Sequence, residues 1–302
     1  MNSRRPDPRR PAPAVAVRLD ARRRSGHRGE GRERGEPRSA RARMESALVD
    51  VSIHRTVAYR DIAAVHYDGH PYAARRAIDK LIAEQDLDER TATAAGGGSF
   101  QTLAATRKGA RHARAAAERH GFDAGQHFCA GWGRPQDAAH DVAIYRAVRA
   151  ARAELAAQGA TLRRIRLDGE LRGIVARRSE AARVRAGKLA ADAERRRAAS
   201  EYHLPIGPDG KVAFPDAQVE YTLTDEEGRD TFGRVNIEVT SPHYNGATVA
   251  AKAAAGFALF GSNGRAARNI VRHLVRAGKA ATGPDTNARG GSNRPPPDLF
   301  EI

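Results

Sequence analysis

The spacing of apolar residues predicts helices and strands along most of the chain. Between residues 44 and 120 it indicates a helix, a short extended piece, two helices joined by a turn, two strands and a last helix. The part after residue 136 has the same mixed character. It is predicted to contain a helix over 137–158, a strand over 161–167, a long helix over about 169–199, three or four short strands within 201–240, and helices over 247–260 and 264–277. The expected fold class is α+β.

Changes in composition divide this pattern into regions. Residues 1–43 are rich in Pro, Gly, Arg and Ser and have almost no large apolar side chains, so they cannot bury enough surface to offset their ordering entropy. A Gly-rich stretch near residue 130 separates the two patterned parts. The predicted regions are a disordered basic arm over 1–43, a first domain over 44–122, a linker over 123–136, a second domain over 137–277 and a disordered tail over 278–302.

The segment 1–43 carries 14 Arg against five acidic residues. A basic segment of this kind can contact phosphates. Two other interpretations stay open. In the first, the segment is an inert tail. In the second, translation starts at Met44, where the first plausible folded element begins.

Two predicted helices joined by Asp68-Gly69 have the order of a helix-turn-helix. Gly tolerates the positive φ of such a turn, and Pro71 suits the first turn of the second helix. The positions that form the buried face of that helix are Ala74, Ile78, Leu81 and Ile82. The positions off this face that suit contacts with DNA are Tyr72, Arg75, Arg76 and Lys80. Arg suits guanine edges and phosphates in the major groove, and Lys suits phosphates.

The segment after this helix predicts a β-hairpin. Residues 89–93 and 99–103 have the composition of strands, and Ala95-Gly96-Gly97-Gly98 supplies the turn. A helix follows, with Arg107 and Lys108 in its first turn as further candidate DNA contacts. The whole stretch resembles winged-helix DNA-binding domains, which implies double-stranded DNA as the partner. The alternative is a winged helix used for protein contacts or for a homodimer.

The chain has 52 Lys and Arg against 36 Asp and Glu, a net charge of +16. Outside the basic arm, the excess of positive charge lies in residues 163–199, which have 12 Lys and Arg against five acidic residues. Basic residues fall nearly all round the helix predicted there. It contacts a phosphate backbone, with Arg177 and Arg178 as candidates, or it is a solvated helical surface.

Two stretches of strict alternation predict a hairpin of half-buried strands, 217–224 and 235–240. In this hairpin, Asp216 lies opposite about residues 238–240, and parity places it on the same face as Glu238 and Thr240. Two carboxylates with an adjacent carbonyl are suitable ligands for Mg²⁺. The plain alternative is that Asp216 caps a turn and Glu238 is a solvated surface residue.

These residues resemble the motif of the PD-(D/E)XK nuclease superfamily. Pro215-Asp216 matches its first half, and Glu238-Val239-Thr240 stands where the second half reads E-x-K. The resemblance implies a small α/β restriction-endonuclease-like domain, in which Asp216 and Glu238 bind Mg²⁺ and water attacks a phosphodiester. Thr240 stands in place of the Lys, and Lys252 on the following helix is the candidate replacement.

The overall layout resembles the replication-relaxation family of plasmids and mobile elements, over roughly residues 45–262. The elements that carry this resemblance are the winged helix, His140-Asp141 opening a helix, Asp216, Glu238 and the helix with Lys252. It implies a DNA-binding protein in plasmid replication or mobilisation, with a Mg²⁺-dependent DNA endonuclease or nickase as the enzyme hypothesis. The alternative is a non-enzymatic winged-helix transcriptional regulator or accessory factor, which Thr240 favours.

Cysteine usage and hydropathy narrow the setting. The single Cys129 excludes an intramolecular disulfide framework and a Cys-rich zinc site, and it fits a reducing cytoplasm. No apolar run approaches the length of a transmembrane helix, so the expected location is cytoplasmic and no membrane partner is expected.

Overall fold

A computed structural model describes residues 39–281, except residues 95–96, 208, 225–226 and 242. The predicted arm and tail lie mostly outside the described residues, and so does part of the predicted glycine turn. Two boundaries were wrong. Helix α1 begins at Ala40, where the Ser39 side chain accepts a hydrogen bond from Ala42 N, and α8 continues to Ala281. The described residues form a mixed α+β fold with two β-sheets, which confirms the predicted class.

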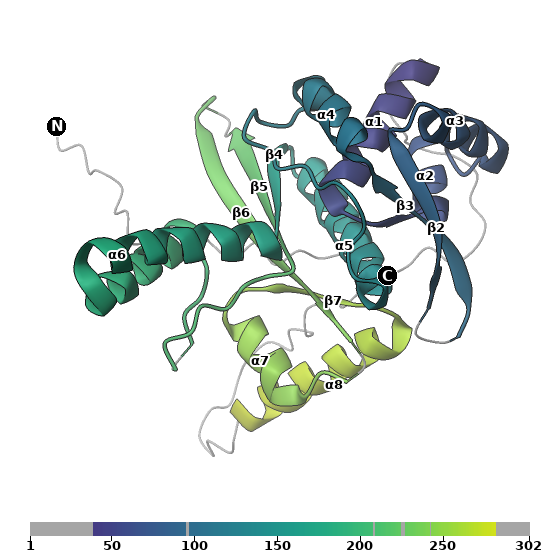
Figure 1. Cartoon of the computed structure of the whole chain (residues 1–302). Coiled ribbons are helices and arrows are strands. Elements are labelled where there is room, and N and C mark those ends of the chain that lie inside the picture. The colour runs from purple at the N-terminus through teal and green to yellow at the C-terminus, as the bar shows by residue number, and fades with distance from the viewer. Residues whose placement is uncertain (1–38, 95–96, 208, 225–226, 242, 282–302) are drawn as a thin grey trace.

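The first sheet belongs to the first half of the described chain and is antiparallel, with strand order β1-β3-β2 (Figure 1). The elements of this half are α1 (Ala40–His54), β1 (Val57–Ala58), α2 (Tyr59–His66), α3 (Pro71–Ala83), β2 (Leu87–Thr93), β3 (Ser99–Ala105), α4 (Arg107–Ala116) and the 3-10 helix η1 (Ala117–His120). The turn between α2 and α3 has positive φ at Asp68 and Gly69, as the sequence predicts. Pro71 occupies the first turn of α3.

The second sheet has the order β4-β5-β6-β7, in which β7 pairs parallel to β6 and the other pairs are antiparallel. The elements of this half are the 3-10 helix η2 (Pro135–Asp137), α5 (Ala138–Ala157), β4 (Thr161–Leu167), α6 (Asp168–Glu201), β5 (Ala217–Thr224), β6 (Asp230–Thr240), α7 (Gly246–Ala254), β7 (Ala258–Gly261) and α8 (Gly264–Ala281). Only an isolated bridge between Ile206 and Val212 adds to the described strands within 201–240.

The predicted helix over 247–260 was wrong in its second half. Helix α7 ends at Ala254, and Gly256 turns the chain with a φ of 78°. Leu259 and Phe260 are then both buried in the parallel strand β7. A short strand buried on both faces has no alternation, so its apolar run cannot be told from a helix by pattern.

The predicted single helix over about 169–199 is a bent element. Ala186 and Gly187 have non-helical backbone angles, with a φ of 81° at Gly187, and the second half of α6 returns along the first. We call residues 168–201 the α6 arm; it projects from the second sheet in Figure 1. Leu171, Val175 and Ala198 form a small core at its base.

A single cluster of buried side chains joins the two halves. It includes Ile53 of α1, Tyr145 of α5, Val219 of β5 and Phe260 of β7. Helix α5 lies between the two sheets (Figure 1). The segment 123–136 between the halves is also fastened, because Gln126 exchanges two hydrogen bonds with the backbone of Ile165, at 2.8 and 2.9 Å.

Candidate functional site

The hairpin of β5 and β6 brings Asp216 and Glu238 to one end of the second sheet. Ala217 pairs with Ile237, so the register places Asp216 beside Glu238, as the alternation predicts. One carboxylate oxygen of Asp216, Oδ2, accepts a hydrogen bond from Val239 N at 2.7 Å. Asp216 is thereby held against the strand that carries Glu238.

Glu238 is 3% exposed and has two donors at its carboxylate. Lys252 Nζ lies 2.8 Å from Oε2, and the Tyr244 hydroxyl donates to Oε1 at 2.8 Å. Lys252 also donates to the carbonyl oxygen of Phe214 at 3.2 Å. Burial, and then the charge of Asp216, raise the pKa of Glu238 against the opposing effect of Lys252. Burial and the Glu238 charge also raise the pKa of Tyr244, which therefore acts as a donor.

His140 completes this end of the sheet. It lies at the start of α5, and its Nε2 is 3.2 Å from Asp216 Oδ1. The hydrogen bond to Asp216 raises the pKa of His140, and the charge of Asp141 adds to the effect. The structure therefore assembles Asp216, Glu238, Lys252 and His140 into one centre, which we call the acidic centre.

A contact that the sequence did not predict joins the first half of the chain to this region. Arg55 ends α1 with a φ of 65°, and its Nη1 lies 3.8 Å from Asp141 Oδ1. Asp141 is buried, and burial raises its pKa to about 6 despite the Arg55 charge. A non-glycine residue with positive φ signals a constrained position. Here the residue that follows α1 is turned towards Asp141, the neighbour of His140.

The prediction that β5 is half-buried was wrong, because its polar face is covered too. Gln218 and Glu220 are buried. Gln218 Nε2 donates to the Tyr202 carbonyl, just after the α6 arm, at 2.8 Å. Glu220 pairs with Arg166 of β4 and with Arg234 of β6, the latter at 2.8 Å. Elements distant in sequence thus provide partners that the alternation cannot reveal.

The predicted DNA contacts on α3 differ in their surroundings. The Tyr72 side chain is 81% exposed and Arg76 is exposed. The Lys80 ammonium lies 3.8 Å from Glu84, at an exposed site. Arg75 is engaged instead, because its guanidinium binds Asp79 on α3 and Glu89 on β2 at 2.8 Å. Arg75 therefore ties α3 to the strand beside it.

The remaining predicted contacts lie on other elements. Arg107 is exposed at the start of α4, whereas Lys108 donates to the carbonyl of Glu84. On the α6 arm, Arg177 is exposed, but Arg178 is bound to Glu194 and Glu201. These side chains are not part of the acidic centre.

All four carboxylate oxygens of the acidic centre have hydrogen-bond donors. In the described ranges, no group of three or more His, Cys, Asp and Glu side chains is arranged to hold a metal ion. Each of the four carboxylate oxygens accepts one hydrogen bond and keeps a further lone pair. Binding of Mg²⁺ by Asp216 and Glu238 stays a prediction from the sequence.

Comparison with known proteins found no match to this chain among family models, curated proteins or solved structures. None of the helices within the described residues is long and apolar enough to cross a lipid bilayer.

Proposed function

We propose that the protein binds double-stranded DNA through the exposed face of α3. The observation that carries this proposal is the order of elements: helices α2 and α3, then the β2–β3 hairpin, with exposed Tyr72 and Arg76 on α3. This is the order that a winged helix requires, with the second helix of the pair in the major groove and the hairpin as the wing.

In this proposal, neighbouring basic residues of α3 have different roles: some contact DNA and one links the helix to β2. Arg76 has no carboxylate within ion-pair distance in the part of the chain that the structure describes, so it can meet a phosphate or a guanine edge. Lys80 is available too, since its exposed pairing with Glu84 is worth little. Arg75 instead links α3 to β2 through Glu89, while its bond to Asp79 stays within α3.

Duplex binding can be measured by fluorescence anisotropy over a range of salt concentrations. Arg76→Gln is expected to weaken binding and to reduce the slope of log K against log salt by about 0.9, the value for one lost phosphate contact. Arg119→Gln is the control, since Arg119 is exposed on η1 and pairs with Glu45. If wild-type protein binds no duplex, or Arg76→Gln behaves like the control, the proposal is wrong.

A second candidate function is cleavage of DNA at the acidic centre. It is favoured by the convergence of Asp216, Glu238 and Lys252, the residue types that the resemblance to PD-(D/E)XK nucleases implies. Against it, Thr240 stands where the motif has its Lys, and Thr240 is buried against the Phe260 carbonyl. We therefore place DNA binding without cleavage first, in keeping with an accessory factor or regulator.

Incubation with supercoiled plasmid and Mg²⁺ or Mn²⁺ separates the two candidates. Binding without nicking is expected. Nicking that is lost in both Asp216→Ala and Glu238→Ala would establish the nuclease and reverse our order of preference. A role in plasmid replication or mobilisation stays a prediction from the family resemblance.

A further inference from the structure

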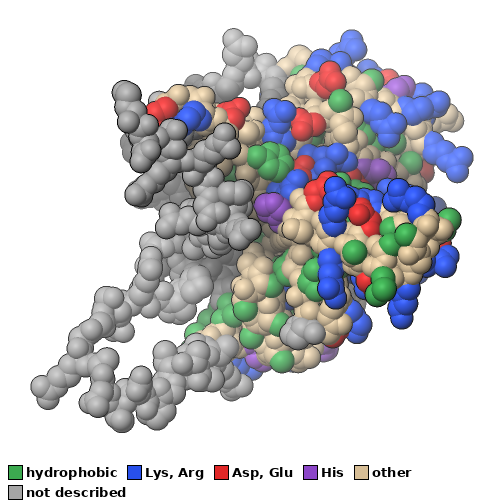
Figure 2. Space-filling model, turned by 90° about the vertical axis from the view of Figure 1, so that its left-hand side faces the viewer, with side chains coloured by type: hydrophobic (Ala, Val, Ile, Leu, Met, Phe, Trp, Pro, Cys, Tyr) green, Lys and Arg blue, Asp and Glu red, His purple; other side chains and the backbone are tan. Residues whose placement is uncertain are grey.

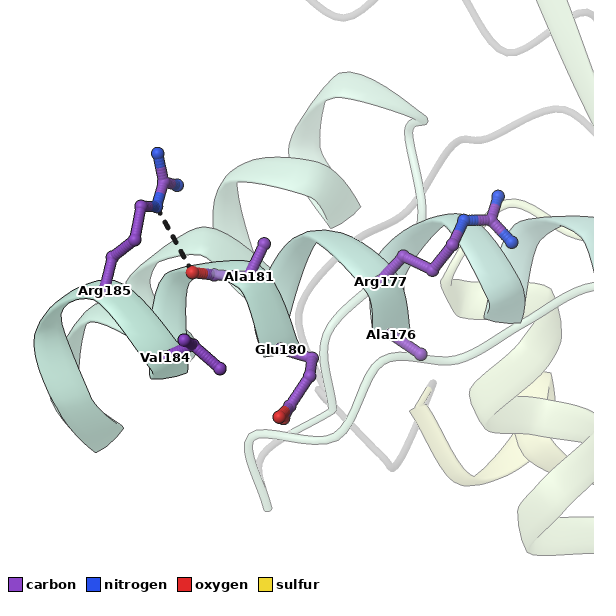
Figure 3. Close-up of a pocket in the computed structure, with 6 residues that line it drawn as sticks. All are labelled: Ala176, Arg177, Glu180, Ala181, Val184 and Arg185. Atoms are coloured by element: carbon purple, nitrogen blue, oxygen red, sulfur yellow. Dashed lines mark hydrogen bonds between the residues drawn. The ribbon is translucent and has the colours of Figure 1, made fainter.

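The α6 arm is a two-helix hairpin held by its own side chains. Arg178 on the outgoing half binds Glu194 at 2.7 Å and Glu201 at 2.6 Å on the returning half. Ser179 Oγ donates to the Ala191 carbonyl at 3.1 Å. These bonds cross the hairpin, and Gly187 makes the reversal. The free end is thus a defined surface at the far end of a braced element (Figures 1 and 3).

Two large apolar side chains stand in solvent at this free end. Val184 is 73% exposed and Leu189 is 86% exposed. An open apolar hollow lies along the outgoing half beside them. The residues that line it are Ala176, Arg177, Glu180, Ala181, Val184 and Arg185 (Figure 3). Val184 lines this hollow and Leu189 stands just past the reversal, so the free end offers apolar surface to solvent.

The cations around these apolar side chains are exposed. Arg177, Arg185 and Lys188 have no carboxylate within ion-pair distance among the residues that the structure places. Arg183 and Arg195 differ, because they pair with Glu180 and Asp192. Figure 2, which views the molecule from the side toward which the arm projects in Figure 1, shows Lys and Arg side chains mixed with hydrophobic ones on this face.

We propose that the free end of the α6 arm is a second contact with duplex DNA, in which Val184 and Leu189 enter the minor groove and Arg177, Arg185 and Lys188 bind the flanking phosphates. This inference rests on the proposed function. Proteins that bend DNA combine apolar side chains at base steps with cations on the phosphates beside them. The arm has both kinds of side chain within its final turns.

Two other partners fit the same surface less well. A stable dimer buries about 800 Å² on each partner, and two apolar side chains cannot supply that area. A helix that lies on a membrane needs a continuous apolar face, whereas charged residues interrupt this one at Glu180 and Arg185. Duplex DNA requires only a narrow apolar tip between cations.

The base of the arm adjoins the acidic centre. Asp168 N, at the start of α6, donates to the carbonyl oxygen of Asp216 at 3.1 Å. From Asp168 to Arg185 the helix rises by about 26 Å, at about 1.5 Å per residue. That length corresponds to roughly 7 to 8 base pairs of duplex, at about 3.4 Å per base pair. The free end of the arm therefore stands a distance of about 7 to 8 base pairs away from the acidic centre.

Salt-dependent binding of a 40-base-pair duplex to the full chain tests the phosphate contacts. Arg185→Gln combined with Lys188→Gln is expected to reduce the slope by about 1.8, because two phosphate contacts are lost. The control is Arg183→Gln combined with Arg195→Gln, which removes the same charge from cations that are already paired. Equal slopes for the two double variants would overturn the proposal.

Hydroxyl-radical footprinting tests the apolar contacts on the same duplex. Wild-type protein is expected to protect the minor groove in a separate patch, and Val184→Ser combined with Leu189→Ser is expected to lose that patch alone. Protection that survives would overturn the inference and leave the α3 proposal intact. Loss of all duplex binding in wild-type protein would overturn the proposed function itself. Vesicles of phosphatidylserine and phosphatidylcholine that bind through these residues, with unchanged footprints, would also overturn the inference.

Discussion

Lys252 Nζ lies 2.8 Å from Glu238 Oε2, so helix α7 supplies the cation that the E-x-K pattern places two residues after the Glu. Thr240, at that position, is 1% exposed, and its Oγ1 lies 3.3 Å from the Phe260 carbonyl oxygen on β7. A Lys at 240 would be buried where β6 meets β7. The cation beside Glu238 therefore comes from α7 and not from β6.

The Glu238–Lys252 pair gives a first prediction. Lys252→Met leaves the buried carboxylate of Glu238 without its cation, which should lower the free energy of unfolding by about 3–5 kcal/mol. Adding Glu238→Gln should recover much of this loss, because the unpaired charge is gone. Urea unfolding measures both. Lys211→Met is the control, since Lys211 is exposed and pairs only with Asp209, and should change stability by less than about 0.5 kcal/mol.

Asp141 is expected to cost stability at neutral pH. Its folded pKa of about 6 lies above the ordinary 3.8, so the folded state resists ionisation, and stability falls as pH rises through this interval. Asp141→Asn removes the titrating group and should raise the free energy of unfolding at pH 7.5 by roughly 1–3 kcal/mol. The gain should fade as pH falls towards 4. An equal gain at pH 4 and pH 7.5 would contradict the assignment.

His54 should respond to acid in the opposite direction. It is fully buried beside Tyr145, and burial lowers its pKa from 6.5 to about 4. The unfolded state therefore takes up a proton first, and stability falls as pH drops from 6.5 towards 4. Between pH 7.5 and pH 5 this effect amounts to about 2 kcal/mol. His54→Leu should lose that part of the pH dependence, although it also loses the hydrogen bond between Nδ1 and the Asp50 carbonyl.

The Asp141 and His54 effects change the free energy of unfolding with pH in opposite directions. Urea unfolding of Asp141→Asn and His54→Leu at two pH values therefore tests both. Acidification from pH 7.5 to pH 5 should destabilise Asp141→Asn more than wild type and His54→Leu less. Parallel pH profiles in the three proteins would show that neither burial effect operates.

The α6 arm allows a prediction with a neighbouring control. Arg178→Ala removes both ion pairs that cross the hairpin, so hydrogen exchange in residues 188–201 should become faster. Arg177→Ala removes a neighbouring exposed cation that makes no ion pair with the returning half among the described residues. It should leave exchange in the arm close to wild type. Equal exchange rates in both variants would show that the hairpin does not depend on Arg178.

The β5–β6 hairpin that brings Asp216 beside Glu238 could be predicted, because alternation sets the register of two strands around a short loop. The partners of its polar face could not. Gln218 and Glu220 alternate with apolar residues in the way that exposed positions do, yet Tyr202 and Arg166 bury them. Such partners depend on how distant elements pack against the strand. The alternation of apolar and polar residues carries no information about that packing.

The same limit explains other differences at the site. The contact between Arg55 and Asp141 joins residues far apart in the chain without any shared motif. On α3, helical spacing predicted the outward face, where Tyr72 and Arg76 are exposed. It did not predict that Arg75 is bound to Glu89, because the position of β2 beside α3 follows from the tertiary fold.

The core that runs from Ile53 through Tyr145 to Val219 has one more consequence. Two units on a flexible tether could reach targets at any spacing along a partner. Here packed side chains fix the separation between α3 and Asp216. A partner that contacts both would have to present its two contact points at that one spacing. Inserting residues into the 123–136 segment should therefore disrupt the packing between the two halves and not simply increase this separation.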